Sequence, residues 1–218
     1  VDDVIDVAEE ETTEDMHKMA GMDALDDYYS QTSVFEMVKK RVRWLILLFV
    51  GQIFTVTAMS AYQSVIAGAV LLSLFIPMII SSGGNSGSQA ATLIIRAMAT
   101  DDIKPSDWRK IFNRELLSGI MLGIFIGILG VAMTIIWGLF HGEELNPGLI
   151  LTAVSIGLSL LGVIIFGNLS GAMLPFILTK LKLDPAVTSA PFVATLVDVT
   201  GIIIYFSISA FLLKGILL

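Results

Sequence analysis

Long apolar runs without a charged residue dominate the hydropathy pattern of the chain. No Asp, Glu, Lys or Arg occurs from Trp44 to Ile95, from Leu116 to Phe140 or from Leu145 to Thr179, and the run from Pro185 to Leu213 contains one charged residue, Asp198. A helix needs roughly 20 apolar residues to cross the hydrocarbon core of a bilayer. The first run is long enough for two helices and breaks best at SAYQS. We therefore expect five transmembrane helices, over residues 42–60, 65–99, 110–140, 147–179 and 186–216.

The segment before these runs alternates apolar and polar residues with helical spacing. Val4 and Val7, then Met16 and Met19, recur at intervals of three, which predicts a helix over residues 1–20 that ends at Gly21. Further on, an apolar stripe leads into the first transmembrane helix; it consists of Val34, Phe35, Val38 and Val42.

Composition and charge support a membrane protein. The 218 residues are 55% hydrophobic, with a mean hydropathy of +0.84, which excludes a soluble globular domain. The net charge of −7 comes from the first 27 residues, which hold eleven acidic residues and one lysine. This acidic segment either meets cations or a basic surface, or forms a solvated helix face. The absence of cysteine excludes disulfides and thiolate metal sites, and no signal peptide is recognisable.

Basic residues predict the orientation in the membrane. If the N-terminus is cytoplasmic, the five helices place all basic residues except Lys214 on the cytoplasmic side, which the positive-inside rule favours. The C-terminus is then external. The residues on the cytoplasmic side are Lys18, Lys39, Lys40, Arg41, Arg43, Arg96, Lys104, Arg109, Lys110, Arg114, Lys180 and Lys182.

Polar and small residues interrupt three of the expected transmembrane helices. The second contains Pro77 and SSGGNSGSQ, which indicates either a kink with interhelical hydrogen bonds or the lining of a polar pathway. Asn168 in the fourth is more readily explained as a helix–helix hydrogen bond than as a ligand. Gly119, Gly123 and Gly127 in the third recur every four residues and predict a close helix–helix contact.

Asp198 is the only formal charge that we expect within the cores of the five helices. An aspartate at a helix centre costs about 3 kcal/mol even on lenient insertion scales. Pro191 should free a backbone carbonyl near Val187, and Thr195 adds a hydroxyl. Carboxylate, carbonyl and water oxygens are the ligands of a hard divalent cation. The alternative is a protonated Asp198 that forms a hydrogen bond with Asn85 or Asn168.

The residues favour a cation channel or transporter over an enzyme. An intramembrane serine protease needs a buried histidine, but His17 and His141 lie outside the expected helices. An aspartyl protease needs two membrane aspartates, and a proton-coupled carrier usually has inverted repeats, which are not apparent. A symmetric dimer would bring two copies of Asp198 together and match the charge of a divalent ion.

The segments FIPMIISSGGNSGSQAATLIIRAMA, FGNLSGAMLPF and DPAVTSAPFVATLVDVTGIIIYFS together resemble the MgtE family of magnesium channels and transporters. The resemblance extends over the whole chain. It implies a homodimer of five-helix protomers in the plasma (inner) membrane, with a pore on the two-fold axis lined by the second and fifth helices. It also implies that cytoplasmic N and CBS domains, absent here, precede this chain in its full-length form. Residues 1–20 would then be the end of a CBS-domain helix, residues 21–41 the plug helix and residues 42–218 the pore domain.

The resemblance also assigns site residues. Asp198 matches the aspartate of the ATLxDVTG motif, where two copies hold hydrated magnesium. Ala194 and Ala190 would offer backbone carbonyls, and Asn85 would shape the pore. We expect neither an organic cofactor nor a nucleic-acid partner. The expected partners are divalent cations and membrane lipid. A carrier of broader selectivity, for Mn²⁺, Co²⁺ or Ni²⁺, is the alternative function. The expected pore lining further includes Gly83, Gly84, Thr195, Pro191 and Asn168.

Overall fold

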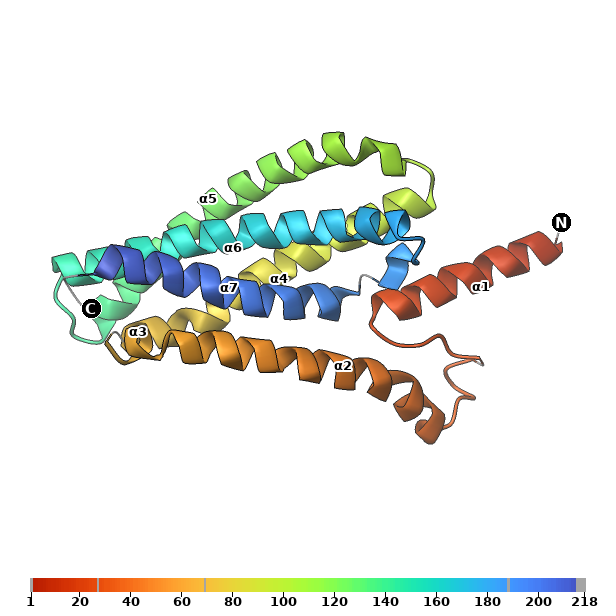
Figure 1. Cartoon of the computed structure of the whole chain (residues 1–218), viewed down its shortest axis with the longest axis horizontal. Helices are drawn as coiled ribbons and strands as arrows, with labels where there is room; N and C mark the ends of the chain where they lie inside the picture. Colours follow the sequence, from red (N-terminus) through yellow and green to blue (C-terminus); the bar gives the residue numbers. More distant parts are fainter. Residues whose placement is uncertain (1, 27, 69, 188, 215–218) are drawn as a thin grey trace.

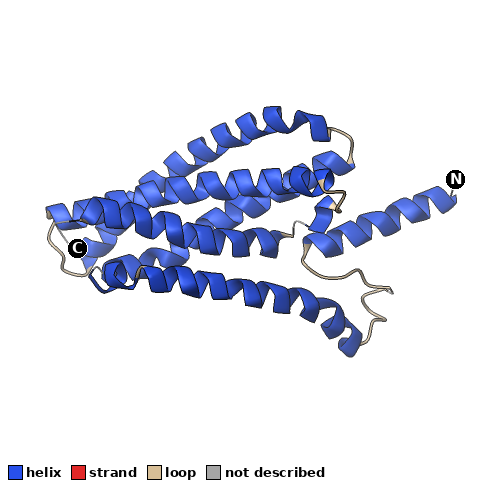
Figure 2. Cartoon of the chain, viewed as in Figure 1, coloured by secondary structure: helices blue, strands red, loops and turns tan. Residues whose placement is uncertain are grey.

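The structure, a computed structural model, describes residues 2–26, 28–68, 70–187 and 189–214, and this part of the chain is helical and contains no strand (Figure 2). Two short 3-10 turns, η1 (Pro105–Asp107) and η2 (Pro185–Val187), precede α5 and α7. The expected all-α class is therefore confirmed. The α-helices are α1 (Asp2–Met19), α2 (Val34–Ala61), α3 (Gln63–Gly68), α4 (Val70–Ala99), α5 (Trp108–Phe140), α6 (Pro147–Lys180) and α7 (Ala190–Leu213).

Helix α6 forms the centre of the bundle. It packs against α4, α5 and α7, and has the largest buried share of the candidate membrane helices (Figure 1). Helix α2 lies along α7 on the outside of the bundle and has no buried residue. Helix α1 extends away from one end of the bundle and touches η2. Helix α7 therefore lies between the central helices and α2.

In the described part of the chain, four segments are long and apolar enough to cross a membrane. They are α2, η1 with α5, α6 and α7. Helix α4 has 30 residues, more than a full crossing needs, and carries the polar SSGGNSGSQ segment near its middle. The structure thus supports a polytopic membrane protein.

Two helix boundaries differ from those that the sequence predicted. Residues 20–26 and 28–33 are not helical, so the expected amphipathic helix over residues 21–41 is described only from Val34 onward. Gly21 adopts φ +74°, which ends the preceding helix, and the Ser33 side chain accepts a hydrogen bond from the Glu36 amide, which begins the next. Helix α2 then continues without a break to Ala61, because no helix-breaking residue separates the two predicted segments.

The first break within the long apolar run lies close to the predicted site. Helix α2 ends at Ala61, within SAYQS, and Tyr62 caps it through its backbone N–H to the carbonyls of Met59 and Ser60. The second transmembrane helix, predicted over residues 65–99, corresponds to α3 and α4. The chain thus turns back toward the opposite end of the bundle.

Glycines allow α4 and α6 to approach at backbone distance. A Cβ atom on Gly167 would collide with the carbonyl oxygen of Gly83, and one on Gly171 with that of Gly87. Conversely, a Cβ atom on Gly87 would lie 2.7 Å from the Gly167 oxygen. Such contacts between small residues are a main source of helix association in membranes, where lipid is as apolar as the helices.

A second row of glycines joins α5 to α6. Gly119, Gly123 and Gly127 are buried, and a Cβ atom on Gly127 would lie 2.8 Å from the carbonyl oxygen of Gly157. The predicted close contact along this row is confirmed.

Hydrogen bonds fix α7 against its neighbours. The Tyr205 hydroxyl donates to the Leu72 carbonyl of α4 at 2.8 Å, and the hydroxyls of Ser155 on α6 and Ser209 are 2.8 Å apart. Tyr205, Ser155 and Ser209 have polar side chains that are buried among apolar ones, whereas Leu72 contributes only its backbone carbonyl. Because each has a partner, they fix the rotation of α7 and therefore the direction of its polar residues.

We predict that Gly171→Ala destabilises the protein by about 2 kcal/mol, because the new methyl group meets a backbone oxygen that cannot move aside. Gly162→Ala is the matched control on the same helix, since its Cβ atom would lie 3.1 Å from Ile204 Cγ2, a side-chain methyl group, and would meet no backbone oxygen. Unfolding in denaturing detergent measures both free energies. Equal stability of the two variants would contradict the proposed packing.

Candidate cation site

Asp198 lies in the middle of α7 and is half-buried. Its Oδ2 accepts a hydrogen bond from Nε2 of Gln52 on α2, with an N···O distance of 2.8 Å. A hydrogen bond to an ionised group is stronger than one between neutral groups, and it offsets part of the cost of removing the carboxylate from water. The two helices thus meet at this carboxylate.

The sequence offered hydrogen bonds of Asp198 with Asn85 or Asn168 as an alternative, but these asparagines bond to other residues. The amide of Asn85 donates to Ser81 on its own helix, at 3.4 Å, and Asn168 bonds to other groups. The partner that sequence reasoning missed is Gln52. One signal could have revealed it: Gln52 is the only carboxamide in the apolar run from Trp44 to Tyr62.

The start of α7 differs from the prediction around Pro191. The helix was expected from residue 186, but it begins at Ala190, with the Ser189 side chain accepting from the Phe192 amide at 3.3 Å. Pro191 therefore lies in the first turn, where a missing N–H costs nothing, and frees no carbonyl. The Val187 oxygen instead accepts from the Ser189 amide at 2.7 Å. The expectation of a proline-freed carbonyl near Val187 is wrong.

Thr195 and Ala194 lie one turn before Asp198 and are half-buried. The Thr195 hydroxyl donates to the Pro191 carbonyl at 3.0 Å, so it is bonded to its own helix. Ala194 packs on Gly84 of α4, where an added Cβ atom would lie 3.6 Å from the Ala194 Cα and Cβ atoms. Gly83 is buried against α6 and α7, and its Cβ atom would lie 2.9 Å from Val197 Cγ1. The two glycines thus bring α4 close to Asp198.

Ala190 is bonded to Ser88, which lines a shallow depression on α4. The Ser88 hydroxyl donates to the Ala190 carbonyl at 3.2 Å, which joins the first turn of α7 to α4. The depression, about 430 Å³ in volume, is lined by Ser88, Gln89, Thr92 and Leu93. Hydroxyl and amide groups therefore line the surface next to Ala190.

One face of α4 exposes polar side chains in a bundle whose other exposed surfaces are mainly apolar. Asn85 lies on this face and is exposed, although the sequence places it in the middle of a transmembrane helix. We call this face the polar stripe of α4; its intervals of three and four residues put its members on one side of the helix. Its residues are Ser81, Asn85, Gln89 and Thr92.

Asn168 is buried away from this stripe, between α4, α5 and α6. Its Oδ1 accepts from the Ser86 hydroxyl at 3.3 Å, and its Nδ2 donates to the backbone oxygen and Oε2 of Glu115, at 2.7 and 2.8 Å. This is the helix–helix hydrogen bond that the sequence favoured for Asn168. Glu115, which the sequence reasoning overlooked, is a second half-buried carboxylate, so Asp198 is not the only charge drawn into the bundle.

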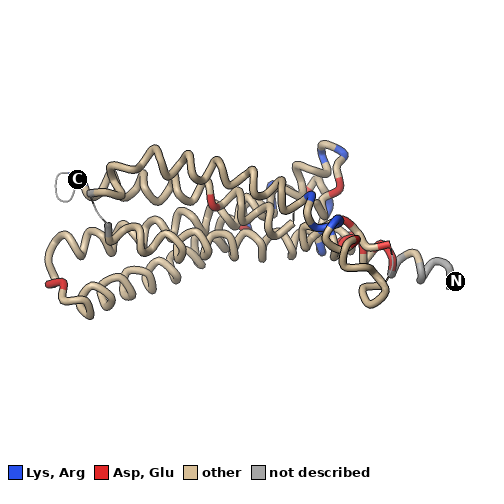
Figure 3. The backbone as a smooth tube through the Cα atoms, turned by 90° about the horizontal axis from the view of Figure 1, so that it is seen from below, with Lys and Arg blue, Asp and Glu red and all other residues tan. Residues whose placement is uncertain are grey.

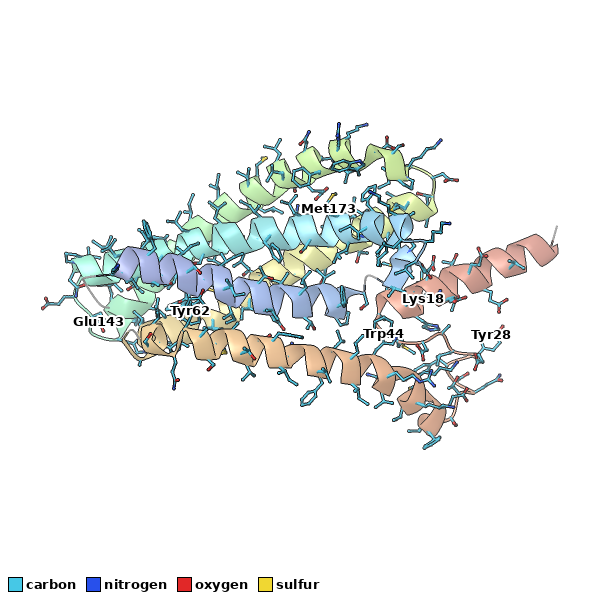
Figure 4. All side chains as sticks on the ribbon, viewed as in Figure 1. Lys18, Tyr28, Trp44, Tyr62, Glu143 and Met173 are labelled. Carbon is cyan, nitrogen blue, oxygen red and sulfur yellow. The ribbon has the colours of Figure 1, made fainter. Side chains whose placement is uncertain are left out.

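Basic residues gather at one end of the bundle (Figure 3). Figure 4 shows Lys18 and Trp44 at this end and Tyr62 and Glu143 at the other. The ammonium of Lys18 lies 2.6 Å from Asp184, just before η2, and 2.7 Å from Glu14. The pair with Asp184 attaches α1 to the segment that precedes α7, whereas the pair with Glu14 lies within α1.

The charges at this junction perturb one another. Hydrogen bonds to Asp184 and then to Glu14 raise the pKa of Lys18 above its ordinary range. The stabilisation from these pairs is thus present below the ordinary lysine pKa of about 10.4 and is lost only as the pH rises above it. Burial, followed by the nearby Asp184, raises the pKa of Asp15. Within the described residues, no three His, Asp or Glu side chains come together as a metal-binding group.

Long apolar helices, a half-buried carboxylate and an exposed stripe of hydroxyl and amide groups define a polytopic membrane protein with polar groups inside its apolar helices. The chain belongs to the MgtE family: the family model, described as a divalent cation transporter, matches residues 76–208. The resemblance seen in the sequence is therefore confirmed, and the family is one of transporters.

Curated relatives match nearly the whole chain. It is 41% identical over 216 residues to the magnesium transporter MgtE of Thermus thermophilus, a match that covers 99% of this chain and 46% of that protein. The magnesium transporters MgtE of Enterococcus faecalis and Bacillus subtilis are 34% and 31% identical, over 98% and 96% of this chain and 45% and 44% of their own lengths. The chain thus spans about half the length of the curated relatives it matches.

We predict that Asn168→Leu destabilises the protein by about 2 kcal/mol or more, because it leaves Glu115 and Ser86 without their partner. Asn85→Leu is the matched control, since the same change at an exposed position should alter stability by only about 0.5 kcal/mol. Unfolding free energies in detergent test the pair. If Asn85→Leu proves as destabilising as Asn168→Leu, the assignment of Asn168 to the bundle interior is wrong.

Proposed function

We propose that the chain forms the ion pathway of a magnesium transporter and that Asp198 is its cation site. The observation that carries this proposal is the half-buried Asp198 in the middle of an apolar helix. Charged groups at this depth are costly and mark ion or proton pathways by default. Membership of a divalent cation transporter family and the names of the relatives support magnesium as the transported ion.

Two copies of the chain form the pathway in this proposal, with a pore on their two-fold axis. Each protomer supplies one Asp198, and two carboxylates balance the charge of a divalent ion. The polar stripe of α4 supports this arrangement, because exposed amide and hydroxyl groups are costly against lipid but favourable along a watery pore. The packing of Gly84 on Ala194 keeps the stripe next to α7. The pore is therefore lined by α4 and α7.

The site holds magnesium through water. Magnesium requires octahedral oxygen coordination at about 2.0–2.1 Å and gives up its water reluctantly, so carboxylates that bind the hydrated ion avoid most of the dehydration cost. The ion is attracted strongly enough to enter and weakly enough to leave. The carbonyls of Ala194 and Ala190 and the side chain of Asn85 contribute neutral oxygens to the path.

A broader divalent-cation carrier is the second candidate. Carboxylate, amide and hydroxyl oxygens also suit Mn²⁺, Co²⁺ and Ni²⁺. A protein of this kind would use the same residues and would differ in which ion it favours at Asp198.

In the proposed topology α4 is the second of five transmembrane helices and adds one to the four long apolar segments. The polar stripe lowers its hydropathy, but a helix that lines a pore need not be apolar on every face. The concentration of basic residues at the end that holds α1 supports a cytoplasmic N-terminus, an external C-terminus and a place in the cell membrane (Figure 3).

The family resemblance implies cytoplasmic domains ahead of this chain, among them a pair of CBS domains, and the greater length of the relatives is compatible with them. We assign residues 1–20 to the end of the CBS region, residues 21–41 to the connection that plugs the pore, helical only from Val34, and residues 42–218 to the pore domain.

We predict that Asp198→Asn lowers magnesium uptake by more than about tenfold, because it removes the charge that attracts the ion while keeping the shape of the side chain. The control is Glu143→Gln, which should leave uptake unchanged. Glu143 lies in the turn between α5 and α6, at the end of the bundle away from Lys18. Uptake into cells that lack other magnesium transporters, or growth at limiting magnesium, measures the effect. Near-normal uptake in Asp198→Asn would remove Asp198 from the pathway.

A further inference from the structure

The hydrogen bond between Gln52 and Asp198 joins the proposed cation site to a helix that lies outside the expected pore lining. Gln52 belongs to α2, and its Nε2 lies 2.8 Å from Asp198 Oδ2. A neutral amide donor neither repels a cation nor competes with it for charge. The bond occupies Oδ2 and leaves Oδ1 as the other acceptor of the carboxylate.

The packing of α2 on α7 directs Gln52 toward Asp198. A Cβ atom on Gly51 would lie 2.9 Å from Thr195 Cγ2, so the two helices approach closely one turn before the carboxylate. Gln52 is half-buried, although most of the surrounding α2 residues are exposed. The residues of α2 that turn toward the bundle recur at intervals of three and four, as one helix face requires; they are Leu48, Gly51, Gln52, Thr55, Ala58 and Met59.

Thr55 lies one turn beyond Gln52 on this face. Its Oγ1 is buried and has no hydrogen-bond partner within the described structure. An unpaired buried hydroxyl in a native structure needs an explanation, and one explanation is an ordered water. A water at this point would lie along the same helix face that carries Gln52.

Helix α2 is attached to α7 independently at the far end. The hydroxyls of Tyr62 and Ser207 are 2.7 Å apart, and the ring of Tyr62 stacks on Phe206 with 5.6 Å between centroids. Because this second attachment holds the helix, loss of the Gln52 amide removes a contact to Asp198 without releasing α2. The two hydrogen bonds can therefore be compared as matched changes on one interface.

We propose that Gln52 is a positioning residue for the cation: it holds Oδ2 of Asp198 and so presents Oδ1 to the hydration shell of the passing ion. The inference rests on the proposed role of Asp198 and adds a residue of α2 to that site. Fixing the carboxylate before the ion arrives lowers the ordering cost of binding, and thus raises affinity. Without the amide, the carboxylate rotates freely and binds the ion less well.

The test compares magnesium uptake by Gln52→Met, which keeps the side-chain length but has no donor, with uptake by the wild-type protein. We expect the magnesium concentration for half-maximal uptake to rise about tenfold, the effect of losing a hydrogen bond to a charged group, with the maximal rate changed less. Gln52→Asn, which is polar but too short by one methylene, should behave in the same way and replaces Gln52→Met if that variant folds poorly.

The matched control is Tyr62→Phe, which removes the other side-chain hydrogen bond between α2 and α7. It should leave the half-saturating concentration unchanged, because it does not touch Asp198. An unchanged concentration in both Gln52 variants, or an equal rise in Tyr62→Phe, would overturn the positioning role. Such results would not affect the proposed function, whereas normal uptake in Asp198→Asn would contradict the proposed function itself.

Discussion

The cost of placing a carboxylate among apolar helices governs this structure. Asp198 cannot remain unpaired at that depth, and Gln52 supplies the partner at 2.8 Å. That contact forms only at one rotation of α7 about its own axis. The hydrogen bonds of Tyr205 to α4 and of Ser209 to α6 fix this rotation. It also requires α2 to lie close to α7, which Gly51 permits. The packing of the apolar helices thus fixes the orientation of the Asp198 side chain.

The glycines of α4 and α6 connect the packing around Asp198 to the proposed ion pathway. Gly83 and Gly87 bury one side of α4 against Gly167 and Gly171, so the opposite side, with Asn85, faces outward. A helix held in this way exposes its polar stripe beside the helix that carries Asp198. The Glu115–Asn168–Ser86 hydrogen bonds reinforce the same placement from behind. Packing glycines and exposed polar residues therefore alternate along one helix.

The sequence predicted the features that depend on local pattern. Apolar runs revealed the helical class, and the spacing of Gly119, Gly123 and Gly127 revealed a packing row, because each is a property of one segment. It missed features that depend on how helices are rotated and paired. Gln52 is an ordinary polar residue until α2 lies on α7, and Pro191 changes from a helix breaker to a first-turn residue when α7 begins four residues later than expected. Family resemblance supplied the dimer and the ion, which one chain cannot reveal by itself.

The position of the bound ion tests the account most directly. Manganese can replace magnesium at carboxylate and water ligands and gives an anomalous signal in diffraction. Crystals of the dimer grown with Mn²⁺ should show one anomalous peak on the two-fold axis between the two Asp198 side chains, at a distance that leaves room for water. A peak elsewhere, with Asp198 still bonded to Gln52 and remote from the ion, would contradict the account.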